Sequence, residues 1–271
     1  MSQVKSLSKY TLITGASSGI GFELASVFAK NKHHLILAAR STSKLESLKT
    51  EIEKNYQVVA EVVSIDLSKQ NSAEELYKKI KDKNLQVDIL VNNAGFGDHS
   101  LFLTEEDTKI EEMILLNILT LTKLTKLFLP DMVKNKYGKI LNVASTAAFQ
   151  PGPLMTVYYA TKAYVLSFTE GLYEELKGTG VSITALCPGP TQSGFQNVAN
   201  ISGVALMETL KMPTSKDVAE FGYQALINDQ AVAIHGFMNN MLVKSSTFIP
   251  RSIVRRLVMK LQEKRLAQKN P

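Results

Sequence analysis

Cysteine, tryptophan and long apolar runs are scarce in this 271-residue chain. It has one cysteine, Cys187, and no tryptophan. A single cysteine excludes an internal disulfide and is typical of proteins kept in a reducing compartment, so we expect a cytoplasmic location. No apolar run reaches the roughly 18 residues of a membrane span, which predicts no transmembrane helix. About ten residues precede the first strand-like run, too few for a signal peptide followed by a mature start.

Metal ligands and acidic tail residues are also sparse. The histidines (His33, His34, His99 and His235) are scattered and show no ligand spacing with Cys187, so we expect no metal site. Residues 241–271 hold eight basic side chains against Glu263 alone, a balance of +7 that leaves −1 for the rest of the net +6. The basic character therefore belongs to the tail. Nucleic-acid binding is not expected, because no recognised motif or aromatic interleaving accompanies this charge.

Short apolar runs alternate with helical patterns along most of the chain. Strands are predicted at 10–13, 34–39, 58–65, 87–91, 139–144, 181–186 and 231–234, with helices at 19–30, 43–55, 72–82, 104–134, 157–177 and 215–228. We expect a break near Pro130, and a capping box of Thr214 and Asp217 before the last of these helices. The alternation predicts an α/β fold in three layers, a Rossmann-type doubly wound parallel sheet. We expect one catalytic domain over 1–240 and a basic amphipathic helical tail over 241–271.

A glycine-rich turn joins the first strand to the first helix. Glycines there allow a tight turn and a close approach of backbone to a pyrophosphate, which a helix N-terminus attracts. The turn lacks the Gly-Lys-Ser/Thr of a P-loop, which leaves a dinucleotide site or a plain glycine-rich turn as its interpretations. The predicted contacts are Gly15, Ser17, Ser18, Gly19, Ile20 and Gly21.

The second strand ends in Arg40, where an acidic residue would bind the ribose hydroxyls and repel a 2′-phosphate. An arginine can pair with that phosphate instead, which favours NADP(H) over NAD(H). The alternative is that Arg40 is a solvated strand end.

Tyr158 and Lys162 are spaced to share one helix face, where an ammonium would stabilise an ionised phenol. The spacing is weak evidence by itself, because Tyr77/Lys81 and Tyr173/Lys177 repeat it.

Several motifs in order resemble the short-chain dehydrogenase/reductase family, in its single-domain form, over about residues 9–235. They are Thr14-Gly15-x-x-x-Gly19-x-Gly21, Asp66, Asn92-Asn93-Ala94-Gly95, Asn117, Ser145, Tyr158-x-x-x-Lys162 and Pro188-Gly189. The tail is similar to those of ketoacyl-reductase-like members of unassigned specificity. Many NADP-preferring relatives carry a basic residue inside the glycine turn, where this chain has Ser17 and Ser18, so NAD(H) stays an alternative.

The resemblance implies roles for individual residues. Tyr158 would be the general acid in carbonyl reduction, Lys162 would lower the tyrosine pKa and hold the nicotinamide ribose, and Ser145 would bind the substrate oxygen. Asn117 would hold a water that relays protons to Lys162. The implied cofactor contacts are Asp66 and Leu67 at the adenine, Asn92, Ala94 and Gly95 along the adenosine ribose and nicotinamide side, and Pro188, Gly189 and Thr191 around the nicotinamide.

The pocket walls are expected from residues 147–155 and from a substrate lid at about 192–213, whose apolar composition favours a hydrophobic substrate. We therefore predict NADPH-dependent reduction of a hydrophobic ketone, aldehyde or ketoacyl compound to an alcohol. The alternative is a non-catalytic NADP(H)-binding sensor or scaffold.

From Pro250 onward, the tail shows Ile253, Val254, Leu257, Val258 and Leu261 on one helical face. It would pack on its own or a partner subunit of a homodimer or homotetramer, or make a peripheral membrane contact.

Overall fold

A computed structural model describes residues 9–195, 199, 212–246 and 248–266 of the chain. Seven parallel strands form one sheet in the order β3-β2-β1-β4-β5-β6-β7. The strands are β1 (Lys9–Thr14), β2 (His34–Ala39), β3 (Ala60–Ser64), β4 (Gln86–Asn92), β5 (Gly138–Val143), β6 (Val181–Cys187) and β7 (Val232–Ile234). The strand order reverses between β1 and β4, and this confirms the predicted Rossmann-type α/β class.

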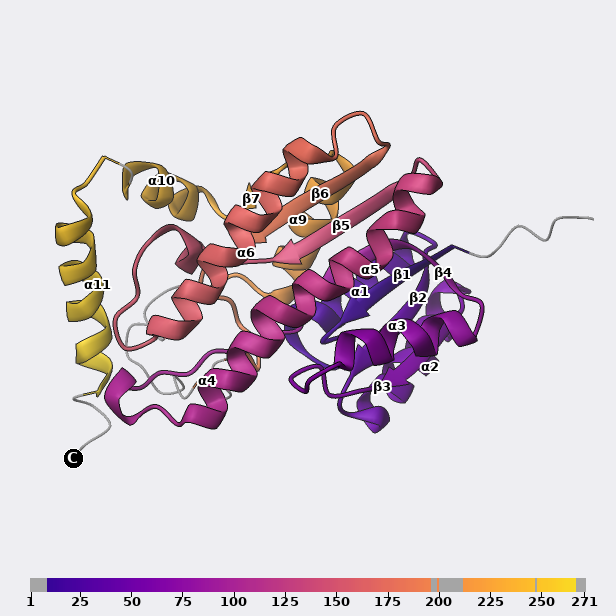
Figure 1. The fold of residues 1–271 in the computed structure, drawn as a ribbon, viewed down its shortest axis with the longest axis horizontal. Coiled ribbons are helices and arrows are strands. Elements are labelled where there is room, and N and C mark those ends of the chain that lie inside the picture. Colours follow the sequence, from indigo (N-terminus) through magenta and orange to yellow (C-terminus); the bar gives the residue numbers. More distant parts are fainter. Residues whose placement is uncertain (1–8, 196–198, 200–211, 247, 267–271) are drawn as a thin grey trace, which may run out of the picture.

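Helices cover both faces of the sheet (Figure 1). Apolar side chains of α1 (Gly19–Lys30), α2 (Thr42–Tyr56) and α9 (Ser215–Ile227) fill the core on one face. Those of α3 (Ser72–Asp82), α5 (Leu121–Lys134) and α6 (Thr156–Glu175) fill it on the other. The strands are almost wholly buried, as expected for a parallel sheet covered on both sides. The predicted capping box is present, since the Thr214 hydroxyl accepts from Asp217 N at 3.1 Å and Asp217 accepts from Thr214 N at 2.9 Å.

The region predicted as one helix with a break near Pro130 has a different irregularity. It begins as α4 (Asp107–Ile114), passes through a π-helical turn (Leu115–Thr120) and continues as α5 straight through Pro130. Pro130 and Lys126, whose carbonyl loses its helical partner, both face solvent, so water can satisfy that carbonyl. The predicted break is therefore wrong.

Within the described residues, the stretch Asp107–Lys134 meets the length and composition of a membrane-crossing helix, which the sequence-based expectation missed. In this fold it packs as a core helix, with Leu124, Phe128 and Met132 buried against the sheet.

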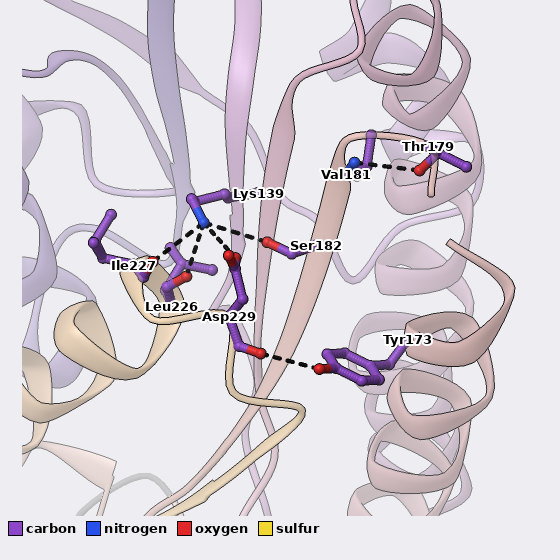
Figure 2. A network of polar contacts seen from close by, with 8 residues as sticks. All are labelled: Lys139, Tyr173, Thr179, Val181, Ser182, Leu226, Ile227 and Asp229. Carbon is purple, nitrogen blue, oxygen red and sulfur yellow. Dashed lines mark hydrogen bonds and ion pairs between the residues drawn. The ribbon is translucent and has the colours of Figure 1, made fainter. Parts of the chain in front are cut away.

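Lys139 of β5 ties together the edge of the sheet that is remote from the carboxyl ends of the strands (Figure 2). Its ammonium donates to the carbonyls of Leu226 and Ile227 at 3.3 and 3.4 Å, and it pairs with Asp229. The Tyr173 hydroxyl on α6 donates to the Asp229 carbonyl at 3.2 Å. The last turn of α9 is thus held by a cation, which its free carbonyls favour.

The tail contains α10 (Phe237–Ser246) and α11 (Arg251–Leu266), and α10 crosses the predicted boundary between residues 240 and 241. Figure 1 shows α11 across the side of the molecule toward which β5 points. Val254 and Val258 are buried, whereas Ile253, Leu257 and Leu261 are about half exposed. The predicted single apolar face is therefore divided into one side packed on the domain and one side facing solvent.

Candidate active site

A cavity of about 750 Å³ runs along the carboxyl ends of the strands, from Arg40 after β2 to Tyr159 on α6. Such a crevice at the point where strand order reverses is where doubly wound folds bind ligands. All the predicted site residues line it except Gly21, Asn92 and Asn117. Residues 196–198 and 200–211 of the predicted lid lie outside the described residues, while Ser193, Gly194 and Phe195 line the cavity.

The glycine turn after β1 forms a cradle that side chains would fill. Gly15 has φ +67° and Gly19 has φ +58°, in the left-handed region that favours glycine. A Cβ on Gly21 would lie 2.3 Å from the Gly15 carbonyl oxygen, so Gly21 serves the packing of the turn and not a direct contact. Helix α1 starts at Gly19 with no acidic residue in its first turn. Its free N–H groups and exposed backbone fit a pyrophosphate.

The end of the cavity that is predicted to hold the adenosine carries two cations. Arg40 is joined by Lys44 of α2 and by Ser41, neither of which was predicted from the sequence. Burial raises the pKa of Asp66, but hydrogen bonds from Ser68 N (3.0 Å) and Oγ (2.8 Å), with the charges of Arg40 and Lys69, hold it below its ordinary value. Asp66 is therefore an ionised acceptor at neutral pH, which fits a contact with an adenine amino group.

The two asparagines after β4 have different positions. Asn92 is buried and donates to Thr125 Oγ1 at 3.1 Å and to Asn142 Oδ1 at 2.9 Å. Its side chain points into the sheet interior and does not line the cavity, contrary to the predicted ribose contact. Asn93 lines the cavity, and its amide donates to the Thr14 carbonyl at 2.9 Å, which ties β4 to the glycine turn.

Asn117 lies in the π-helical turn, a feature frequent at functional sites. Its side chain accepts from Phe96 N at 3.2 Å and donates to Phe96 O at 2.9 Å and to Thr161 Oγ1 at 3.1 Å. A Cβ on Gly95 would lie 3.0 Å from Asn117 Oδ1 and 3.5 Å from Lys162 Nζ. Asn117 therefore lies next to Gly95 and close to Lys162, although it does not line the cavity itself.

Ser145, Tyr158 and Lys162 meet in the middle of the cavity. Ser145 follows β5, and its hydroxyl accepts from Ala147 N at 3.0 Å. Tyr158 and Lys162 project from one face of α6, with Lys162 Nζ 5.8 Å from the centre of the phenol ring. The ammonium donates to the Val143 carbonyl at 2.8 Å. A hydroxyl, a phenol and an ammonium thus converge on one place, a set suited to binding and protonating a carbonyl oxygen.

Burial is the largest cause of the pKa shifts of Tyr158 and Lys162. It raises the pKa of Tyr158 well above its ordinary value, and a hydrogen bond with Ser145 offsets part of that rise. Burial lowers the pKa of Lys162 to about 8. The predicted lowering of the tyrosine pKa by Lys162 is not seen here, because the ammonium is directed at Val143 O. Tyr158 is therefore a protonated phenol across the neutral range.

The residues predicted to surround the nicotinamide, Pro188, Gly189 and Thr191 after β6, line the cavity together. Thr191 donates to the Gly189 carbonyl at 2.9 Å, which fixes the turn. A Cβ on Gly189 would lie 2.5 Å from Nδ2 of Asn239 on α10. The tail therefore approaches this turn closely, which no sequence motif indicated.

The substrate end is largely apolar and includes one unexpected residue. Ala147, Met155, Phe195 and Tyr159 line it, as does Gln262 of α11. Gln262 is 4% exposed and its amide donates to the Tyr159 hydroxyl at 3.4 Å. It continues the buried row of Val254 and Val258 at intervals of four, which is the one signal in the sequence that it faces inward.

Fold and site together define a nucleotide-dependent oxidoreductase. The chain belongs to the short-chain dehydrogenase family, whose model matches residues 9–202.

Named relatives and solved structures agree with this assignment. A very-long-chain 3-oxoacyl-CoA reductase of Bos taurus is 35% identical over 67% of this chain, and the match spans 59% of that relative's length. An uncharacterised oxidoreductase of Staphylococcus saprophyticus is 36% identical over 80% of this chain and 91% of its own. A short-chain dehydrogenase from Sphingobium yanoikuyae, solved in complex with NADPH, has a TM-score of 0.79 and 28% identity over 88% of this chain and 93% of its own.

Proposed function

We propose that this protein reduces a carbonyl group of a hydrophobic substrate to an alcohol with NADPH. The observation that carries the proposal is the convergence of Ser145, Tyr158 and Lys162 in one cavity that also reaches the cations Arg40 and Lys44. The glycine cradle fits a pyrophosphate, Arg40 fits a 2′-phosphate and Asp66 fits an adenine amino group, and a structural relative was solved with NADPH bound. NAD(H) is the alternative cofactor.

Each residue has a role in the proposed reaction. Bound in the cavity, NADPH would supply the hydride to the carbonyl carbon. Tyr158 donates its phenol proton to the carbonyl oxygen, and Ser145 donates a hydrogen bond to the same oxygen as its charge develops. Lys162, anchored on Val143 O, holds the nicotinamide ribose. Asn117 positions the Gly95–Phe96 backbone through its hydrogen bonds to Phe96. It would also hold a water that relays protons to Lys162.

The substrate is proposed to be a ketone, aldehyde or ketoacyl compound with an apolar body. Ala147, Met155 and Phe195 supply an apolar wall beside Tyr158, whose ring lies 5.4 Å from that of Phe195. The relative from Bos taurus is named for very-long-chain 3-oxoacyl-CoA, which is such a substrate.

A panel of apolar ketones, aldehydes and ketoacyl thioesters, assayed by the loss of NADPH absorbance, tests this function. Tyr158→Phe is expected to lower kcat by about 10²–10⁴-fold and to keep NADPH binding, because the phenol proton is lost and the ring is kept. Tyr173→Phe is the matched control, since it also lies on α6 four residues before a lysine but outside the cavity. Unchanged turnover and cell phenotype in Tyr158→Phe, with NADPH still bound, would support the sensor or scaffold alternative.

We further propose a catalytic unit over residues 1–240 that assembles as a homodimer or homotetramer in the cytoplasm, with the tail of 241–271 in peripheral contact with a membrane. The single cysteine, Cys187, is buried, which fits a reducing compartment. Light scattering measures the assembly. Liposome flotation with and without residues 250–271 measures the contact, and equal flotation of both forms would refute the tail's part in it.

A further inference from the structure

The tail helices expose an unusual number of apolar side chains. We define the tail segment as residues 237–262, with residue 247 outside the described residues. Nine of its apolar side chains are more than a third exposed: Phe237, Met238, Met241, Leu242, Phe248, Ile249, Ile253, Leu257 and Leu261. The exposed fractions of Phe237 and Phe248 are 81% and 89%. Clustered exposed apolar residues of this kind mark an interaction surface.

The positive charge of the tail segment indicates what kind of partner it binds. Its basic residues are Lys244, Arg251, Arg255, Arg256 and Lys260, and its sequence contains no acidic residue. Arg256 and Lys260 each follow an exposed apolar residue, Ile253 or Leu257, by three positions, so they lie beside it on the helix. Cations flanking an apolar stripe complement an anionic lipid surface. A two-fold contact with a second copy would instead bring these cations against one another.

The inner side of α11 packs on the domain, and its residue Gln262 lines the cavity. Val254, Val258 and Gln262 are buried, and Gln262 donates to the hydroxyl of Tyr159. The Tyr159 ring lies 6.1 Å from that of Tyr158, and a Cβ on Gly152 would lie 2.1 Å from it. Tyr159 is therefore confined between the catalytic tyrosine, Gly152 and the tail. Helix α11 is at once a wall of the cavity and part of the exposed apolar surface.

We propose that the tail segment docks on an anionic lipid bilayer, and that docking moves α11 at the Gln262–Tyr159 contact so that a lipid-dissolved carbonyl substrate enters the cavity from the bilayer. The proposal rests on the carbonyl reduction and the membrane contact proposed above, and it names the route by which the substrate arrives. A lipophilic substrate is concentrated in the bilayer, so a cavity wall that touches lipid shortens its path through water.

Docking is tested by flotation of the full chain with phosphatidylglycerol and with phosphatidylcholine vesicles. The wild type is expected to bind phosphatidylglycerol and to lose binding as salt is raised. Leu257→Glu is expected to lower the partition coefficient about tenfold, since it removes an inserted side chain and adds repulsion. Val59→Glu, at a site of similar exposure on the body (44% against 53% for Leu257), is the matched control and should bind as the wild type does. Equal binding of Leu257→Glu and wild type, or concentration-dependent dimerisation through the tail in place of vesicle binding, would overturn the docking.

Coupling to the cavity is tested by hydrogen exchange, which requires no turnover. Phosphatidylglycerol vesicles should slow exchange in 251–262 and change it in 150–159 of the wild type, but not of Leu257→Glu. Unchanged exchange in 150–159 on docked protein would refute the coupling.

A turnover assay separates the coupling from the proposed chemistry. The vesicles should raise kcat/KM for a long-chain methyl ketone at least about fivefold and leave cyclohexanone unaffected, because only the former partitions into lipid. Gln262→Leu should change KM for the long-chain ketone at least about threefold with the NADPH Kd preserved, since its amide lies at the substrate end. Turnover of both ketones without a vesicle effect would overturn the route alone, whereas no turnover of any carbonyl compound would count against the reductase itself.

Discussion

Replacing Arg40 by alanine is expected to weaken NADPH binding and to leave NADH binding unchanged. Arg40 follows β2 and lines the adenosine end of the cavity, together with Lys44 four residues later. An acidic residue at the end of this strand would bind ribose hydroxyls, whereas a guanidinium can pair with a 2′-phosphate that NADH lacks. The two cofactors therefore isolate the contribution of this side chain.

The magnitude follows from the exposure of the site. A hydrogen bond between charged groups contributes about 1.5–3 kcal/mol, and the lower end applies because Arg40 is exposed to solvent. A loss of about 1.5 kcal/mol raises the NADPH Kd about tenfold. Lys44→Ala should have a similar effect. The rise in NADPH Kd for the double variant should be smaller than the product of the two single rises, because both cations would bind the same phosphate.

The same protein preparations are titrated with NADPH and with NADH, and the nicotinamide fluorescence gives the Kd for each cofactor. Lys54→Ala, an exposed lysine of α2 outside the cavity, controls for the general loss of a positive charge. The NADPH preference should also shrink as salt is raised. Equal affinity for the two cofactors in the wild type, unchanged in Arg40→Ala, would refute the reasoning.

Lys162, Gly21 and Lys139 give three further predictions, on catalysis, cofactor binding and stability. Since burial lowers the pKa of Lys162 to about 8, kcat/KM for carbonyl reduction should fall as pH rises through about 8 and the ammonium loses its proton; a flat profile to pH 10 would contradict this. Gly21→Ala should abolish NADPH binding measured by fluorescence, because its Cβ would meet the Gly15 carbonyl, whereas Gly171→Ala, with open space around it, should bind normally. Lys139→Met should lower the free energy of unfolding by about 1–3 kcal/mol and Tm by roughly 2–4 °C per kcal/mol in thermal melts, because the Leu226 and Ile227 carbonyls lose a charged donor and Asp229 loses its ion pair. Lys177→Met, at an exposed ion pair, should change stability by less than about 1 kcal/mol.

The strands and most helices could be predicted because their signals are local. Short apolar runs gave the strands to within about two residues, and the capping box of Thr214 and Asp217 was read directly from its spacing. Pro130 misled the prediction, because a proline on the solvent side of a helix leaves a carbonyl that water can reach. The π-helical turn around Asn117 had no sequence signal, and the partners of that side chain, Phe96 and Thr161, lie far from it in the sequence.

Some residues of the site could likewise be predicted from motifs, and others could not. Asn92 and Asn93 are adjacent in one motif, yet Asn92 ends β4 and bonds to buried Thr125 and Asn142, whereas Asn93 follows the strand and lines the cavity. Lys44 and Gln262 belong to no motif, because each reaches the cavity through the placement of a helix. Tertiary packing decided these positions, so a motif could not reveal them.

The Tyr-x-x-x-Lys spacing shows most clearly what local sequence leaves undecided. All three pairs place the ammonium at a similar distance from the ring centre, 5.3 Å for Lys81 and Tyr77 and 5.8 Å for each of the other two. What separates Tyr158 is burial, which raises its pKa and lowers that of Lys162. A protonated phenol next to an amine that releases its proton near pH 8 is prepared to give a proton, whereas alcohol oxidation would require the phenolate. The protonation state of the buried pair therefore favours reduction at neutral pH and predicts a higher pH optimum for oxidation.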